Sequence, residues 1–214
     1  MNKVKALKVK SNIPELNIPI MLTDDNFPDN VDSNTIDLNM LKEVFKKYPR
    51  LKDNVETEIK NNIAFDDGSV YYGEWKLGTN IKHGRGIQIW DDGSMYQGQF
   101  HNNKAHYLGK LIHQDGDYYD GEWFEGKAQG KGMFVSHYDG SFYKGDWYQD
   151  KQHGKGEEHW KDGSKYIGDY FFCKKTGKGK FIWSNGSTYE GDFLDNEISG
   201  KGKISLIIRY IYLG

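Results

Sequence analysis

The chain has 214 residues and a net charge of −2, and this balance argues against nucleic-acid binding, because nucleic-acid-binding domains usually carry a basic face. Aromatic residues make up 15% of the chain against 36% hydrophobic residues in all, which describes a protein that packs by rings rather than by an aliphatic core. The single cysteine, Cys173, excludes a disulfide framework, and the absence of an apolar run of about 20 residues or a signal-peptide core predicts a soluble, cytoplasmic protein.

Residues 1–36 are predicted to form an extended or disordered segment. The first ten residues alternate lysines with apolar residues and contain no acid. A transit peptide and a membrane-surface contact are the alternatives, but the lack of arginine and the few hydroxyls favour a solvated tail. The rest of the segment reads as a linker, because it carries several Asn and Asp residues together with Pro14, Pro19 and Pro28.

Residues 37–62 are predicted to form a helical cap. Helical spacing joins five side chains, Leu38, Leu41, Val44, Phe45 and Tyr48, and Pro49 ends the pattern. A second, weaker helix is expected over residues 51–60. We expect these helices to pack on the first hairpin and cover its open edge, since a terminal repeat needs protection. The alternative is a helix that docks on a partner.

A tyrosine-x-glycine-x-aromatic motif recurs six times over residues 63–206. Successive tyrosines are 25, 23, 24, 23 and 23 residues apart, and a fixed period marks a repeat architecture. We interpret all the motif residues as structural: Tyr71, Gly73, Trp75, Tyr96, Gly98, Phe100, Tyr119, Gly121, Trp123, Tyr143, Gly145, Trp147, Tyr166, Gly168, Tyr170, Tyr189, Gly191 and Phe193.

Each motif is followed by a glycine-x-glycine pair, and an Asp-Gly or Asn-Gly turn precedes each motif tyrosine. The pairs are Gly84/Gly86, Gly130/Gly132, Gly154/Gly156, Gly177/Gly179 and Gly200/Gly202, with Tyr107 in place of the first glycine in the second unit. Asp-Gly and Asn-Gly favour tight hairpins. Residues two apart in a strand share a face, so rings are expected to lie over glycines of their own and the partner strand.

Residues 71–203 closely resemble the MORN repeat. The chain departs from the pattern at Tyr107 and by short insertions after Trp75 and Gly132, which we expect to be loops or bulges. The resemblance implies a mainly β fold, an elongated single-layer antiparallel meander of MORN-repeat hairpins with the short helical cap at its N-terminal end.

The resemblance also implies a function. Similar proteins are scaffolds of ciliary axonemes, including radial-spoke heads, and of cytoskeletal rings, so we expect a non-catalytic scaffold that binds other proteins, located in the cytoplasm, the cytoskeleton or a cilium. The alternative is a phospholipid-binding membrane-surface module or an accessory to phosphatidylinositol phosphate kinases. No kinase domain fits in the first 62 residues.

The charges on the sheet face opposite the rings, which we call the outward face, indicate whether the partner is a protein or a lipid. Arg85 and lysines 110, 131, 155, 178 and 201 follow a glycine in the six units and could form a basic ladder that attracts anionic lipid. The acids Glu74, Glu122, Asp146, Asp169 and Asp192 fall on the same outward face of the neighbouring strand. We expect cross-strand ion pairs that neutralise the ladder, so membrane lipid is not favoured.

No catalytic, cofactor or metal site is predicted. The glycine pairs lack the third glycine and the lysine-hydroxyl pair of a phosphate-binding loop. His83, His106 and His153 hold equivalent repeat positions and should lie about 10 Å apart. The other histidines, His101, His113, His137 and His159, show no ligand spacing.

The C-terminal residues are predicted to mediate self-association. Residues 204–213 are rich in strand-forming side chains and carry Arg209 as their single charge. An open edge strand offers unpaired backbone groups to another strand, so we expect a homodimer through the C-terminal strand. The residues proposed for this contact lie in the apolar tail over residues 207–214, and they are Ile207, Ile208, Tyr210, Ile211 and Tyr212.

Overall fold

The structure is a computed structural model that describes residues 38–207. It divides into two compact units, with the boundary between Lys127 and Ala128. The elements are α1 (Leu38–Lys47), β1 (Thr57–Ala64), β2 (Val70–Lys76), β3 (Lys82–Ile89), β4 (Met95–His101), β5 (Lys104–Ile112), β6 (Tyr118–Phe124), β7 (Lys127–Val135), β8 (Phe142–Tyr148), β9 (Lys151–His159), β10 (Lys165–Phe171), β11 (Lys174–Ile182), β12 (Thr188–Leu194) and β13 (Glu197–Ser205).

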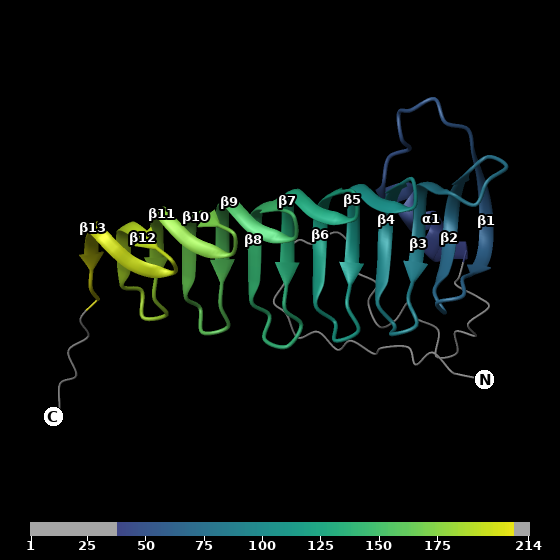
Figure 1. Cartoon of the computed structure of the whole chain (residues 1–214). Helices are drawn as coiled ribbons and strands as arrows, with labels where there is room; N and C mark the ends of the chain where they lie inside the picture. Colours follow the sequence, from purple (N-terminus) through teal and green to yellow (C-terminus); the bar gives the residue numbers. More distant parts are fainter. Residues whose placement is uncertain (1–37, 208–214) are drawn as a thin grey trace. The chain divides into compact units, whose positions relative to one another are not determined.

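Both units are antiparallel meanders, in which strands that are neighbours in the sequence are also neighbours in the sheet (Figure 1). In the first unit, β1 to β6 pair in the order of the chain. In the second unit, β7 to β13 do the same. The predicted mainly β fold, built from antiparallel hairpins with a helix at the N-terminal end, is confirmed.

Each Asp-Gly or Asn-Gly pair makes the turn that was predicted for it. The carboxylate or amide oxygen of the first residue accepts the backbone N–H two residues on, as in the 2.9 Å bond from Ser164 N to Asp162 Oδ1. Gly163 follows with φ of 85°, a conformation that suits glycine and strains other residues. Five further turns repeat this bond, at Asp67, Asp92, Asp115, Asp139 and Asn185.

The motif tyrosine lies flat over glycines, as the sequence predicted. A Cβ added to Gly156 would lie 2.4 Å from the ring of Tyr143, and one added to Gly145 would lie 2.5 Å from the Lys155 carbonyl. The Tyr143 hydroxyl donates a 2.9 Å hydrogen bond to the carbonyl of Asp146. All six motif tyrosines make this bond to the residue three positions on, so ring, glycine and backbone form one repeated unit.

These rings are the core of each unit. Tyr143 meets Trp147 of its own strand edge-on at 5.3 Å between centroids, and Tyr170 of the next repeat at 4.9 Å. The six motif tyrosines are between 0% and 4% exposed. Edge-to-face aromatic pairs add about 0.5–1.5 kcal/mol beyond the area that they bury. The motif tyrosines therefore hold the repeats together and are not available to a partner.

The first glycine of a glycine-x-glycine pair forms a β-bulge at Gly84, Gly154, Gly177 and Gly200. Gly154 has φ of 61°, and the pairing of β8 with β9 shifts register beside it. Tyr107, which replaces this glycine in the second repeat, adopts φ of 59°. The left-handed region costs a side-chain-bearing residue about 1–2 kcal/mol. The departure from the repeat pattern at Tyr107, which was predicted to be a loop or bulge, is a bulge. Tyr107 adopts there the left-handed conformation that the other repeats give to a glycine.

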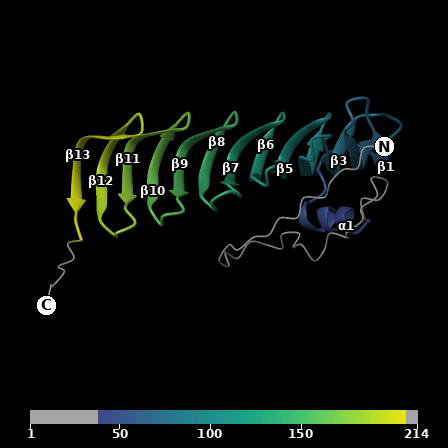
Figure 2. The same cartoon turned by 90° about the horizontal axis from the view of Figure 1, so that it is seen from below.

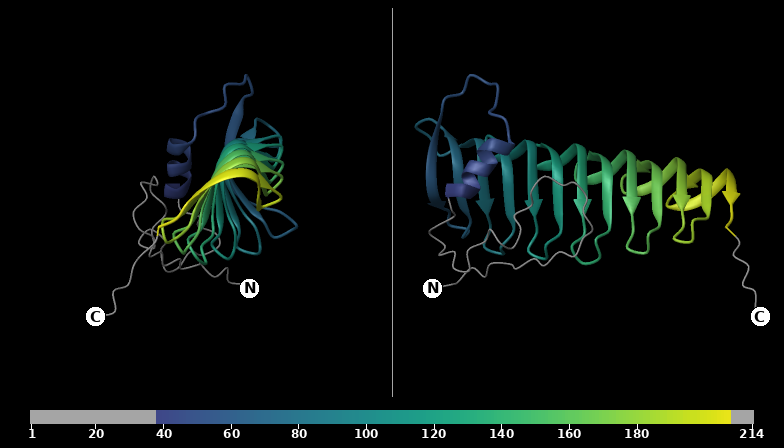
Figure 3. Two further views of the ribbon diagram at one scale, coloured as in Figure 1. Left: turned by 90° about the vertical axis from the view of Figure 1, so that its left-hand side faces the viewer. Right: turned by 180° about the vertical axis from the view of Figure 1, so that it is seen from behind.

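The first predicted helix is α1, but it does not cover the sheet edge. It packs against β3 over one face of the sheet (Figures 2 and 3). This is the face opposite the rings, and Val44 and Tyr48 join Ile87 and Met95 there in a buried cluster. The helix forms because its apolar stripe has this surface to cover. The terminal strand of the unit is β1, which is paired with β2.

The second helix predicted over residues 51–60 is wrong. β1 begins at Thr57, and residues 49–56 form no helix or strand. A stripe formed by Leu51, Val55 and Ile59 is too short to distinguish a helix from a strand, and the pairing of β1 with β2 decides the outcome. The predicted segment over residues 1–36 lies outside the described residues.

Candidate interaction surfaces

The outward face is the face opposite the rings. In the second unit it carries the predicted cross-strand ion pairs: Lys131 with Asp146, Lys155 with Asp169, and Lys178 with Asp192. Each acid also accepts a backbone N–H, such as Lys201 N to Asp192 Oδ2 at 2.9 Å. The Lys178 ammonium and this N–H hold the pKa of Asp192 below its usual range. Each of these three lysine charges is therefore balanced by the aspartate that it contacts.

One member of the predicted ladder was misplaced. Lys110 follows the second glycine of its repeat, and the position equivalent to the ladder belongs to Leu108. Lys110 is 5% exposed, and its Nζ lies 3.8 Å from the centroid of the Tyr118 ring. Burial lowers the pKa of Lys110 to about 8. In the first unit Arg85 pairs with Glu74 at 2.9 Å and donates to the Phe45 carbonyl of α1.

The second unit exposes apolar side chains at the ends of its hairpins. We call Tyr148, Phe171, Phe172 and Leu194 the hairpin-end patch; these residues are between 39% and 60% exposed. Phe172 meets Phe171 at 4.8 Å between centroids and Tyr148 at 6.1 Å. Exposed apolar patches of this kind mark interaction sites. The sequence prediction missed the patch, although aligning the residues that follow each motif aromatic would have found it.

The ring face of the second unit carries a lysine of the chain among its rings. Lys175 Nζ lies 2.6 Å from Glu158 Oε2 and 4.8 Å from the centroid of Trp160. Tyr170 donates a 2.9 Å hydrogen bond to the same carboxylate oxygen. The chain's own Lys175 and Glu158 thus cover part of the ring face. Four further rings along it are half-buried: Trp147, Trp160, Phe181 and Trp183.

The last described strand, β13, forms the C-terminal end of the described sheet. Ile204 and Ile207 are exposed, and Ile207 N donates to Ser187 Oγ at 3.1 Å. The other residues predicted for self-association, Ile208, Tyr210, Ile211 and Tyr212, lie outside the described residues. The self-association therefore stays a prediction.

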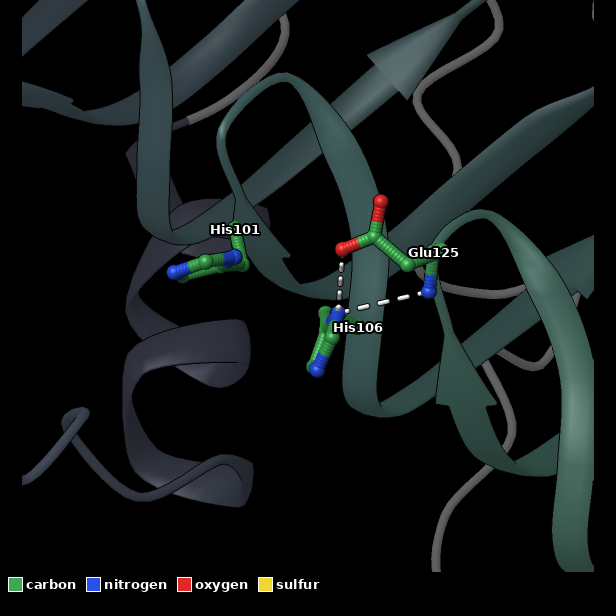
Figure 4. A group of neighbouring side chains, drawn as sticks. All are labelled: His101, His106 and Glu125. Carbon is green, nitrogen blue, oxygen red and sulfur yellow. Dashed lines mark hydrogen bonds and ion pairs between the residues drawn. The ribbon is translucent and has the colours of Figure 1, made fainter.

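Two histidines and a glutamate come together in the first unit (Figure 4). The three residues, His101, His106 and Glu125, each offer a ligand atom, and these atoms lie within 4.8 Å of one another. Burial and His101 together lower the pKa of His106. Sequence reasoning compared equivalent repeat positions with one another, whereas this cluster combines three different positions of two repeats.

Comparison with known proteins decides the family. The MORN repeat model matches residues 71–95, 96–118, 119–137, 143–165, 166–188 and 189–205, which is more than half of the chain. The chain belongs to the MORN-repeat family. MORN repeats serve as protein-interaction or membrane-binding modules, and the comparison finds no catalytic domain beside them. In the described part of this MORN protein, no helix is long and apolar enough to cross a bilayer.

The other comparisons add little. No curated protein matches the chain at a significant level. Among solved structures, the TCP domain of SAS-4 (dCPAP) from Drosophila melanogaster, in complex with a proline-rich motif of Ana2, is 14% identical. The match covers 67% of this chain and 70% of that one, with a TM-score of 0.31. A likeness this weak carries no inference for the MORN protein.

Proposed function

We propose that this MORN protein is a non-catalytic scaffold that binds other proteins in a cytoskeletal or ciliary assembly. The observation that carries the proposal is the hairpin-end patch of the second unit. Tyrosine and phenylalanine are enriched in protein interfaces, and lysine is depleted there. Three of the four patch residues are aromatic, and they project from the ends of neighbouring hairpins.

The ion pairs of the outward face favour a protein partner over an anionic membrane. Binding to anionic lipid gains about 1 kcal/mol for each lysine or arginine near the surface. Lys131, Lys155 and Lys178 each have an aspartate at contact distance, so this gain is largely lost. The cytoskeletal or axonemal setting, including a radial-spoke-like assembly, rests on the resemblance to ciliary MORN scaffolds.

Phospholipid binding is the second candidate, and one observation favours it. Lys151 lies 5.5 Å from the centroid of the Phe172 ring, so a cation stands beside the exposed rings. Rings and cations side by side also suit a headgroup layer. Flotation with anionic liposomes at physiological salt tests this candidate. We expect no flotation; robust flotation that Lys131→Glu, Lys155→Glu and Lys178→Glu together abolish would favour the membrane module or lipid-kinase accessory.

The scaffold is tested by purifying a tagged chain from its own cells and locating it there. We expect copurifying proteins of the cytoskeleton or cilium, and we expect a subset to be lost from the double variant Phe171→Ser/Phe172→Ser. Lys144→Ser is the matched control, because Lys144 is exposed on β8 and lies outside the patch. Partners that bind the double variant as well as they bind the wild type would show that the patch is not the docking surface.

A further inference from the structure

The cluster of His101, His106 and Glu125 is assembled by two turns of the first unit. His101 is the last residue of β4, and His106 lies in β5, so one hairpin carries both imidazoles. Glu125 follows β6 and has φ of 51°, which turns it back toward that hairpin. Glu125 Oε1 lies 3.7 Å from His106 Nδ1 (Figure 4).

The same three repeat positions can be compared elsewhere in the chain. Two repeats further on they hold Tyr148, His153 and Phe172, where the histidine ring lies 5.7 Å from the tyrosine ring and 5.0 Å from the phenylalanine ring. The fold of the repeat therefore brings these three positions into contact, whatever residues occupy them. Two repeats further on they are occupied by packed rings. At His101, His106 and Glu125 they are occupied by three groups that can ligate a metal.

The donor atoms of the cluster are weakly engaged. The Nδ1 atom of His101 is buried and has no hydrogen-bond partner. His106 Nδ1 accepts a long 3.3 Å bond from the backbone N–H of Glu125. The other carboxylate oxygen of Glu125 pairs with Lys104 at 2.7 Å, but both side chains are about half exposed, and such pairs contribute little. Leaving a buried nitrogen unpaired destabilises the folded chain, and coordination of a cation would offset that loss.

We propose that His101, His106 and Glu125 form a zinc site in this MORN protein. Two imidazoles and one carboxylate are a known three-ligand set for zinc, with a water in the fourth position, whereas magnesium and calcium prefer oxygen ligands. Zinc–ligand bonds of 2.0–2.2 Å place tetrahedral ligand atoms about 3.3 Å apart. The three ligand atoms lie within 4.8 Å of one another, so they would have to approach by at most about 1.5 Å to share one ion.

The ion would tie the β4–β5 hairpin to the turn after β6 and so stiffen the first unit. This role is independent of the hairpin-end patch, which lies in the second unit. With three protein ligands and a water, the ion would act through its coordinate bonds as a link between these two segments.

The test titrates the full-length chain with zinc chloride by calorimetry and with cobalt chloride by visible absorption. We expect one ion per chain and the strong absorption of tetrahedral cobalt. His101→Tyr copies Tyr148 at the same repeat position and is expected to weaken binding by more than the about 10–100-fold that loss of an outer-shell partner costs. Glu125→Gln changes an exposed side chain, so it keeps the test valid if His101→Tyr fails to fold.

His153→Gln is the matched control, because Gln129 occupies the same repeat position in the third repeat. The control is expected to bind zinc and cobalt as the wild type does. Wild-type protein that takes up no stoichiometric zinc would overturn the proposal. So would binding that survives both His101→Tyr and Glu125→Gln, or binding that His153→Gln reduces as much as they do.

Discussion

The outward faces of the two units differ at equivalent positions of the same repeat. The residue after the second glycine is Ile87 in the first unit, where it is 0% exposed beneath α1. In the second unit the equivalent residue is Lys180, whose side chain is 45% exposed. The MORN repeat therefore fixes the residue types on the ring face of the sheet and lets the residue types on the outward face vary with what covers that face. In the first unit α1 packs on that face. In the second unit the face carries charged side chains that are exposed to solvent.

The ring faces show the opposite behaviour. Tyr71 in the first unit and Tyr143 in the second are both buried, and each hydroxyl donates to the carbonyl three residues on. Each ring spans glycines of two strands. The shared face is thus the source of stability in both units, and changes on it should cost more than changes on the outward face.

The largest effect is expected from Gly145→Val, compared with Lys144→Val on the adjacent outward position. A Cβ at Gly145 meets the Lys155 carbonyl at 2.5 Å, and backbone cannot move aside as a side-chain tip can. Overpacking commonly costs about 1–3 kcal/mol, and we expect the upper end or more. Thermal melting measures both variants. Equal melting temperatures would count against the packing of rings over glycine.

A smaller effect is expected from Ile87→Ala, which removes buried carbons beneath α1. Replacing a buried isoleucine with alanine costs about 2–5 kcal/mol, and we expect about 2 kcal/mol here, because a helix held by one face can collapse partly onto the site. Lys180→Ala at the same repeat position should lie within about 0.5 kcal/mol of the wild type. Urea unfolding of both variants gives the values. A large loss at Lys180 would contradict the difference between the faces.

How much of this could be predicted from the sequence depends on what sets each feature. The rings and glycines are local and repeat six times, so Tyr143, Gly145 and their equivalents predicted the hairpins correctly. The His101 cluster combines three different repeat positions, so it required coordinates. The hairpin-end patch did not, because aligning the residues that follow each motif aromatic would have found it. The second helix failed because pairing with β2 outweighs the local pattern of residues 51–60.

Acid should weaken the turns at Asp139 and Asp162 of the second unit. The Ser164 hydroxyl and backbone N–H hold the pKa of Asp162 below its usual range, and Ser141 does the same for Asp139. A depressed pKa gives stability that is complete above the unfolded pKa of about 3.9 and is lost as the pH falls through the folded pKa. Asn185 already makes this turn without a titrating group.

The double variant Asp139→Asn/Asp162→Asn should therefore lose less stability than the wild type between about pH 7 and about pH 3. Urea midpoints at both pH values measure the loss. The same loss in both proteins would show that these turns do not contribute to the acid sensitivity.

The smallest effect on unfolding is expected at the C-terminal end, where β13 leaves Ile204 and Ile207 exposed. If the C-terminal edge strands of two chains pair, the protein is a homodimer. Cutting the chain after Lys203 should then make it monomeric, and it should lower the melting temperature by no more than a few degrees. Light scattering after size exclusion measures the mass. A full-length chain that runs as a monomer would refute the pairing.

The difference between the outward faces is tested most directly by thiol labelling of the folded protein. In a Cys173→Ser chain, Ile87→Cys and Lys180→Cys place one thiol at the same repeat position of each unit. We expect the thiol at position 180 to react at nearly the rate of an unfolded chain, and the thiol at position 87 to react at least about 100-fold more slowly, because α1 must first leave the sheet. Equal labelling rates at the two positions would contradict the account.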